Sequence, residues 1–187
     1  VAQVRADLDA YEITRAARAI GDFVVDDVSN WYVPRSRARF WGSTDADDTR
    51  DAFQTLHQVL VAVARLLAPI TPFHADWVHR ALTGRSVHLE RFPEPRPADA
   101  ALIIGMDAVR VLARLGRAAR ATVNIKTRQP LRTMYAVVPA NVDLDEALLD
   151  VVRDELNVKQ VRFLHPAGEP VTYSATPNFR VIGKRFG

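Results

Sequence analysis

The spacing of apolar residues constrains this fold most, because it follows a helical period through residue 121 and then changes. The pattern predicts an amphipathic helix over 5–32 and a second helix over 49–68, with a polar connection at 43–48 between them. It predicts further helices over 72–82 and 100–121. Most of the chain is therefore expected to be helical.

Prolines and a glycine predict where these helices stop. Pro34 is expected to end or kink the first helix, because an interior proline costs about 3 kcal/mol in a lost hydrogen bond and a clash. Pro69 ends the second helix. Thr71 and Pro72 form an N-cap and first-turn pair that begins the third, and Gly84 follows its end.

Beyond residue 121 the pattern changes to short β-branched and aromatic runs. Strands are predicted over 134–138 and 161–164, with a helix over 144–156 between them, and a third strand is predicted over 171–173. This part is expected to be a small α+β unit.

Three prolines within residues 93–99 indicate a semi-rigid linker. The predicted organisation is an antiparallel helix bundle over 1–92, the linker, and an α+β subdomain over 100–187, so the fold class is mainly α. The first helix has no capping residue and the last residues contain no structural stop, which suggests a segment of a longer chain.

Composition excludes several mechanisms. A chain without cysteine has no disulfide, no thiolate nucleophile and no cysteine-bound zinc. No apolar run approaches the roughly 20 residues that cross a bilayer, so a soluble, cytoplasmic protein without a membrane partner is expected. The composition is 48% hydrophobic and 25% charged, which is typical of a globular protein.

The residues that could support catalysis do not converge. The five histidines are scattered, and His74 and His79 lie five positions apart, on different faces of a helix, so a shared metal is not expected. Asp26 and Asp27 point about 100° apart on a helix, which favours a solvated edge over a catalytic pair. The eight glycines do not form a phosphate loop. Neither a catalytic residue nor a cofactor is predicted in this chain.

Basic clusters are the informative feature, and the first spans residues 31–42. Arg35, Arg37 and Arg39 lie there without an acid, between Trp31 and Trp41. Arginine pairs with phosphate and aromatic rings stack on unpaired bases, so this pattern suits RNA. A solvated helix end is the alternative interpretation of the arginines, and Trp31 lies on the apolar face, where a place in the core is favoured.

The second cluster spans residues 107–132, with seven cations and one acid, Asp107. Three of the arginines share one helical face at i, i+4 and i+7 and would present a stripe to a phosphate backbone. A surface helix whose acids lie elsewhere is the alternative; residues 143–155 hold six acids and one arginine. The cations are Arg110, Arg114, Arg117, Arg120, Lys126, Arg128 and Arg132.

Several strings, in order along the chain, resemble the anticodon-binding region of isoleucyl-tRNA synthetases. The most specific are Asn124-Ile125-Lys126-Thr127-Arg128-Gln129-Pro130-Leu131 and the ending Gly183-Lys184-Arg185-Phe186-Gly187, which follows Asn178-Phe179. The others are Asn30-Trp31-Tyr32-Val33 with Arg35-Ser36-Arg37 and Arg39-Phe40-Trp41, the junction Leu67-Ala68-Pro69-Ile70-Thr71-Pro72-Phe73, and Ser86-Val87-His88-Leu89 with Phe92-Pro93. Pro34 departs from the family pattern, which favours a helix-compatible, often basic residue there.

The resemblance implies binding of isoleucine tRNA through its anticodon stem-loop, as part of an enzyme that joins isoleucine to the tRNA using ATP. Neither catalytic signature of that enzyme occurs here, so the remainder of the synthetase is an implied partner, and ATP with magnesium, and zinc, belong to it. A structural or protein-docking module, or the equivalent region of a valyl or leucyl enzyme, are the alternatives. The residues expected to contact tRNA are Arg35, Arg37, Arg39, Trp41, Arg114, Arg117, Lys126 and Arg128.

Overall fold

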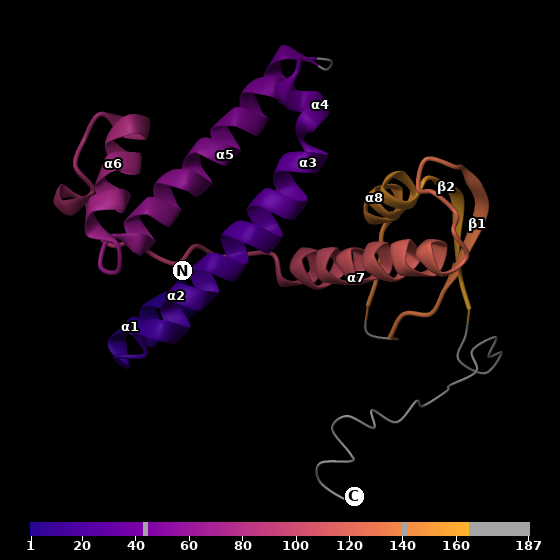
Figure 1. Cartoon of the computed structure of the whole chain (residues 1–187), viewed down its shortest axis with the longest axis horizontal. Coiled ribbons are helices and arrows are strands. Elements are labelled where there is room, and N and C mark those ends of the chain that lie inside the picture. Colours follow the sequence, from indigo (N-terminus) through magenta and orange to yellow (C-terminus); the bar gives the residue numbers. More distant parts are fainter. Residues whose placement is uncertain (43–44, 140–141, 165–187) are drawn as a thin grey trace, which may run out of the picture. The chain divides into compact units, whose positions relative to one another are not determined.

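The computed structural model describes residues 1–42, 45–139 and 142–164 (Figure 1). The chain divides into two compact units, Val1–Pro97 and Ala98–Gly187, with the division inside the proline-rich run of residues 93–99. The described residues are mainly helical, as predicted, and contain one small two-stranded sheet. The two units are described separately.

The first unit consists of helices. Helices α2, η1 and α3 follow one another without a gap, and η1 has the wider π-helical pattern. In order, the elements are α1 (Ala2–Asp9), α2 (Ile13–Asp22), η1 (Phe23–Tyr32), α3 (Val33–Arg35), α4 (Arg37–Phe40), α5 (Ala46–Leu67), α6 (Pro72–Thr83) and the 3-10 turn η2 (Val87–Leu89).

The single helix predicted over 5–32 is wrong, because the chain turns at Tyr11 between α1 and α2. Tyr11 has a φ of 59°, a left-handed conformation that is uncommon outside glycine, asparagine and aspartate. The turn is held by the Glu12 N–H, which donates to the Asp7 carbonyl at 2.7 Å. The buried Asp7 carboxylate also pairs with Arg15 at 3.1 Å. Neither glycine nor proline marks this break in the sequence.

Pro34 does not end the helical stretch. It lies in the first turn of α3, directly after η1, and Val33 before it keeps a right-handed helical backbone. The ten residues before α3 are π-helical, and such wider turns rearrange the local hydrogen bonding. The stretch ends two residues later, at Ser36, whose ψ of 5° is not helical.

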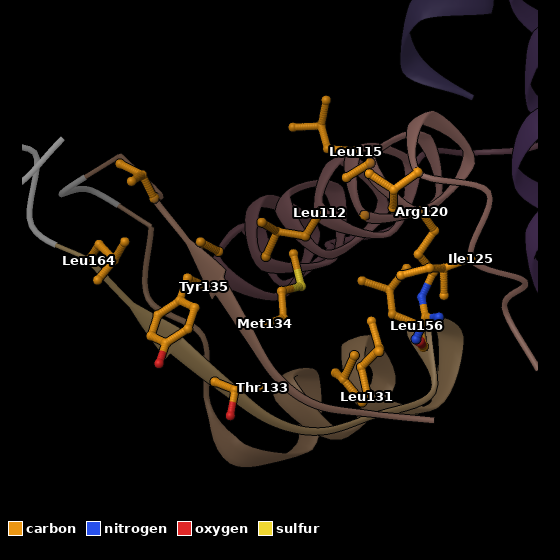
Figure 2. A pocket seen from close by; sticks show the side chains of 16 residues that line it. Leu112, Leu115, Arg120, Ile125, Leu131, Thr133, Met134, Tyr135, Leu156 and Leu164 are labelled. Atoms are coloured by element: carbon orange, nitrogen blue, oxygen red, sulfur yellow. The ribbon is translucent and has the colours of Figure 1, made fainter. Parts of the chain in front are cut away.

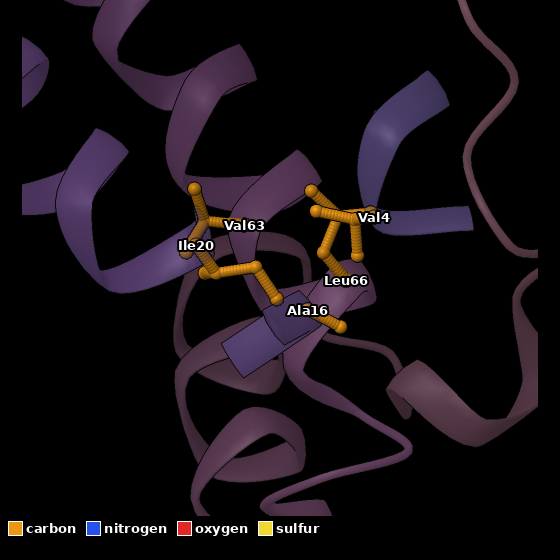
Figure 3. Packing of buried hydrophobic residues seen from close by; sticks show 5 residues of the cluster. All are labelled: Val4, Ala16, Ile20, Val63 and Leu66. Carbon is orange, nitrogen blue, oxygen red and sulfur yellow. The ribbon is translucent and has the colours of Figure 1, made fainter. Parts of the chain in front are cut away.

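The core of the first unit joins α1, α2 and α5 (Figure 3). Val4 comes from α1, Ala16 and Ile20 from α2, and Val63 and Leu66 from α5. Ala16 is completely buried, and its small side chain lets the two longer helices approach closely. This cluster packs α2 against α5. It therefore also helps to position η1, α3 and α4, which follow α2 along the chain.

The helices predicted over 49–68 and 72–82 are confirmed, with one difference at the start of the first. The Asp45 carboxylate accepts a hydrogen bond from the Asp47 N–H at 3.1 Å and caps α5, so the helix begins at Ala46, inside the predicted polar connection. Helix α6 ends at Thr83 and is followed by Gly84 with a φ of 75°, a C-terminal conformation that glycine adopts at little cost.

The second unit contains α7 (Ala100–Thr122), β1 (Leu131–Ala136), α8 (Glu146–Leu156) and β2 (Val158–Phe163). The strands are parallel, with Leu131 opposite Val158, and α8 forms the connection between them. Both predicted strands are present, but each begins three residues earlier than predicted. The third predicted strand, over 171–173, lies outside the described residues.

Helices α7 and α8 approach closely through glycines of α7. A Cβ atom on Gly105 would lie 2.6 Å from Leu148 Cδ1, and one on Gly116 would lie 2.8 Å from Leu156 Cδ2. Leu156 is almost fully buried, so a methyl group on Gly116 would fit only if the Leu156 side chain moved. This packing brings the end of α8 next to the last turns of α7, in the middle of the second basic cluster.

Candidate nucleic-acid interface

The first basic cluster lies on α3 and α4, at the end of α5 opposite α6 (Figure 1). Tyr32 fixes this end by donating its hydroxyl to the Ala52 carbonyl at 3.0 Å. The Phe40 and Phe53 rings pack with their centroids 4.9 Å apart. The cluster is therefore held against α5 by Tyr32 and Phe40.

Three arginines of this cluster have different surroundings. The Arg35 guanidinium lies 5.6 Å from the centroid of the half-buried Trp31 ring, which is cation–π geometry. Arg37 is exposed, and no ion pair or hydrogen bond of its side chain is found among the described residues. Arg39 donates through Nε to Asp48 Oδ1 at 2.9 Å. The structure therefore leaves one of the three readily available to an anionic partner.

The Arg39–Asp48 contact holds α4 against the first turn of α5. Arg39 Nη2 also lies 2.7 Å from Asp48 Oδ1, and the hydrogen bond to Asp48 raises the pKa of Arg39 above its ordinary value. Both side chains are partly exposed, so the ion pair contributes little to stability, at most about 1 kcal/mol. Its main consequence is that a phosphate must compete with Asp48 for this arginine.

Trp41 is the last aromatic residue of the first cluster, and 78% of this residue is exposed. It follows α4 directly and precedes Gly42, whose φ of 70° turns the chain. An exposed tryptophan beside arginines offers a flat face on which an unpaired base can stack. Trp41 is exposed and stays a predicted contact, whereas Trp31 is shared between packing and the contact with Arg35.

The predicted arginine stripe on α7 is only partly free. Arg114 is exposed, and no partner for its side chain is found in the described part of the chain. Arg117 pairs with Glu155 of α8, and Arg110 lies 3.8 Å from Asp107 one turn away. The acids of residues 143–155 thus partly neutralise the stripe, because α8 packs against α7.

Arg120 has a role that the sequence did not reveal. Its side chain is buried, with 5% of the residue exposed, and Figure 2 shows it reaching from α7 toward Leu156. It donates through Nη1 to the carbonyls of Lys126 and Gln129, at 3.1 and 2.9 Å. Through Nη2 it donates to those of Leu156 and Asn157, at 2.6 and 3.2 Å. No pattern of charges along α7 separates it from its exposed neighbours.

The loop over residues 123–130 carries two further cations, Lys126 and Arg128, while Arg132 lies on β1. Asn124 begins it with a left-handed φ of 55°, and the Ile125 N–H donates to the Arg120 carbonyl at 2.9 Å. Lys126 and Arg128 are exposed, and no ion pair of either is found among the described residues. This loop therefore presents two cations without an ion pair in the described structure, on a backbone that Arg120 holds by hydrogen bonds.

A pocket of about 410 Å³ lies beside this loop, between α7 and the sheet (Figure 2). Its walls include Leu112, Leu131 and Met134, and only Arg120, Thr133 and Tyr135 among the lining residues are polar. Such a pocket suits an apolar group, not a phosphate or a metal ion.

Metal-binding clusters and membrane-spanning helices are not found in the described ranges. Within residues 1–42, 45–139 and 142–164, histidines, aspartates and glutamates do not gather in any group of three that could hold a metal ion. No helix in these same ranges is long and apolar enough to cross a bilayer.

Comparison with known proteins identifies the family. Residues 1–135 match the family model described as the anticodon-binding domain of tRNA ligase, and this match includes both basic clusters. The whole chain is 41% identical to an isoleucine–tRNA ligase of Thermus thermophilus, of which it spans 19%. It is 44% identical to that of Deinococcus radiodurans and 40% identical to that of Porphyromonas gingivalis, of which it spans 18% and 17%. The chain belongs to the family of anticodon-binding domains of tRNA ligases.

Proposed function

We propose that this chain is the tRNA-binding region of an isoleucine–tRNA ligase and binds the anticodon stem-loop of isoleucine tRNA. The observation that carries the proposal is a set of exposed cations without acidic partners in the described structure, within the residues that match the family model. They are Arg37, Arg114, Lys126 and Arg128. RNA binding depends on such cations, because each phosphate contact releases counterions.

In the first unit, Arg35, Arg37 and Arg39 are proposed phosphate contacts, and Trp41 is a proposed stacking partner for an unpaired base. The contacts of the arginines rank them. Arg37 has no competing partner among the described residues, Arg35 must leave the Trp31 ring, and Arg39 must leave Asp48. The proposal therefore gives Arg37 the largest contribution.

In the second unit, Arg114, Arg117, Lys126 and Arg128 are the proposed phosphate contacts. Arg117 competes with Glu155, so its contribution is expected to be smaller than that of Arg114. Lys126 and Arg128 stand on the loop fixed by Arg120. A fixed loop loses little conformational freedom when it binds, which favours affinity.

The chain spans less than a fifth of the length of the relatives named above. The proposal therefore includes a remainder of the ligase that joins isoleucine to tRNA in the cytoplasm, using ATP and magnesium, with zinc possible there. It assigns residues 1–92 to an antiparallel anticodon-binding bundle, residues 93–99 to a linker and residues 100–187 to a small α+β subdomain.

A titration of the chain with isoleucine and valine tRNAs at two salt concentrations tests this function. The variant Arg35→Ala/Arg37→Ala/Arg39→Ala is the comparison, and circular dichroism confirms that it remains folded. Salt-sensitive binding that prefers isoleucine tRNA and is weakened in the variant supports the proposal. Weak binding, equal for both tRNAs and unchanged in the variant, contradicts it.

A protein-docking function is the second candidate, and an aromatic patch on α6 favours it. Phe73 and Trp77 lie one turn apart on this helix and are 90% and 69% exposed. The nearby Arg80 pairs with Asp76 at 2.7 Å, so this cation is already neutralised. Exposed aromatic residues that are surrounded by polar residues without net charge are typical of protein interfaces. Trp77→Ala should leave tRNA affinity unchanged if the patch binds protein, and reduce it if the ring stacks on a base.

A further inference from the structure

The loop over residues 123–130 is held through its carbonyl groups. Two of them, those of Lys126 and Gln129, accept hydrogen bonds from Arg120. The two between them, those of Thr127 and Arg128, accept from Asn157 Nδ2 at 3.3 and 2.9 Å. Four successive carbonyls are thus bound by side chains from the end of α7 and the end of α8.

Asn157 is suited to this position by its backbone as well as by its amide. It follows α8 with a φ of 48° and a ψ of 55°, a left-handed conformation that asparagine tolerates better than most residues. Its own carbonyl accepts hydrogen bonds from Arg120 and from the Leu131 N–H, the latter at 3.0 Å. Asn157 therefore links the end of α8 to the middle of the loop, to Leu131 just after it and to Arg120 of α7.

Because Arg120 is buried and donates to four carbonyls, this position favours an arginine. A buried guanidinium needs acceptors for its donors, and the described residues supply four carbonyls in place of a carboxylate. The positive charge of Arg120 is therefore solvated by carbonyl dipoles and is not cancelled by a carboxylate in the described residues. The planar guanidinium directs its donors to fixed points, which a lysine ammonium does not do.

We propose that Arg120 and Asn157 are positioning residues that hold loop 123–130 ready for RNA, so that Lys126 and Arg128 reach phosphates of one RNA backbone. This inference rests on the proposed function. The two residues touch no RNA themselves, and they act by removing the cost of ordering the loop when RNA binds. The hydrogen bonds from the Asn157 amide to the loop contribute to RNA affinity only while Lys126 and Arg128 are present.

The substitution Asn157→Gly tests the inference without disturbing the fold. Glycine adopts the same left-handed backbone readily, so the change removes mainly the two amide contacts with the loop. Asn124→Gly is the matched control, because Asn124 has a similar φ of 55° and its side chain makes no hydrogen bond in the described structure. Affinity for tRNA is measured at several salt concentrations, with thermal unfolding recorded for each variant.

Asn157→Gly is expected to raise the Kd for isoleucine tRNA about fivefold, while Asn124→Gly leaves it within about twofold. Lys126→Ala/Arg128→Ala is expected to reduce the slope of log affinity against log salt by roughly 1.4 to 1.8, from two contacts at about 0.7 to 0.9 each. Adding Asn157→Gly to that variant should then have no further effect, because no cation remains for the loop to position.

Three other outcomes overturn the inference in distinguishable ways. If Asn157→Gly lowers the midpoint of thermal unfolding but leaves the Kd unchanged, the contacts are structural only. If Asn157→Gly weakens binding equally with and without Lys126 and Arg128, the substitution does not act by positioning these two cations. If Lys126→Ala/Arg128→Ala binds like the unmodified chain, the loop is no RNA site, while the triple arginine variant still tests the proposed function in the first unit.

Discussion

Arg39 of α4 is held by Asp48 in the first turn of α5, with Arg39 Nη2 lying 2.7 Å from Asp48 Oδ1. This ion pair sets the conformation of one cation that the proposed function needs. It also opposes that function, because the carboxylate occupies the guanidinium and repels phosphate. In the proposed function, Asp48 therefore weakens RNA binding, and substituting this one residue should strengthen it.

Asp48→Asn is predicted to lower the Kd for tRNA about threefold, since the neutral amide competes weakly for Arg39. Stability should fall by at most about 1 kcal/mol, because the pair is partly exposed. Asp47→Asn is the matched control: it removes the same charge from the same helical turn, from an acid paired with Arg50 at 2.9 Å. Equal effects of the two substitutions would show that only net charge matters and would contradict a specific role for Arg39.

The stability of the first unit is predicted to decrease in acid through Asp76. Its pKa is lowered to about 2 from 3.8 by hydrogen bonds from Ser86 and Arg80. As pH falls below 3.8, the unfolded chain takes up a proton that the folded chain does not, so folding is disfavoured. The contribution of Asp76 is therefore complete above pH 3.8 and is lost as pH falls to about 2.

Asp76→Asn should lower the midpoint of thermal unfolding at neutral pH, and the difference from the unmodified chain should shrink between pH 3.8 and about 2. Asp26→Asn, at an exposed position on η1, is the control and should change little. The explanation for Asp76 is wrong if the difference between Asp76→Asn and the unmodified chain stays constant across that range of pH.

Gly116→Ala is predicted to destabilise the second unit by about 1 to 2 kcal/mol, because the new methyl group meets the buried Leu156 side chain. Gly21→Ala is the matched control, since a Cβ atom on Gly21 would have no neighbouring atom within 4 Å, and it should stabilise the chain by about 0.5 to 1 kcal/mol. Urea unfolding of both variants checks this. A Gly116→Ala variant as stable as Gly21→Ala would show that Leu156 moves aside.

Helix ends marked by proline, glycine or a capping acid could be predicted from the sequence. Thr71-Pro72 and Gly84 mark α6, and Asp99, whose carboxylate caps α7, precedes a helix that begins at Ala100. The turn at Tyr11 could not be predicted, because no special residue marks it and tertiary contacts hold it. The predictions that succeeded depend on chain neighbours, whereas the missed turn at Tyr11 depends on contacts formed by folding. The predicted end at Pro34 also failed, because the helical stretch continues to Ser36.

The candidate site divides in the same way. The exposed cations Arg37, Lys126 and Arg128 could be recognised from their charge and their neighbours along the chain. The pairing of Arg117 with Glu155 could not, because it joins residues of two different helices. Nor could the burial of Arg120, which depends on carbonyls from the loop and from the end of α8.

Binding of an isolated anticodon stem-loop of isoleucine tRNA to this chain, measured by fluorescence anisotropy, separates recognition of the anticodon arm from general attraction to RNA. An acceptor-stem hairpin of equal length and charge is the competitor at the same salt concentration, because backbone electrostatics alone treats the two alike. We expect tighter binding of the anticodon stem-loop, and a loss of this preference in the Arg37→Ala variant. Equal binding of the two hairpins, unchanged by that substitution, would contradict the proposed function.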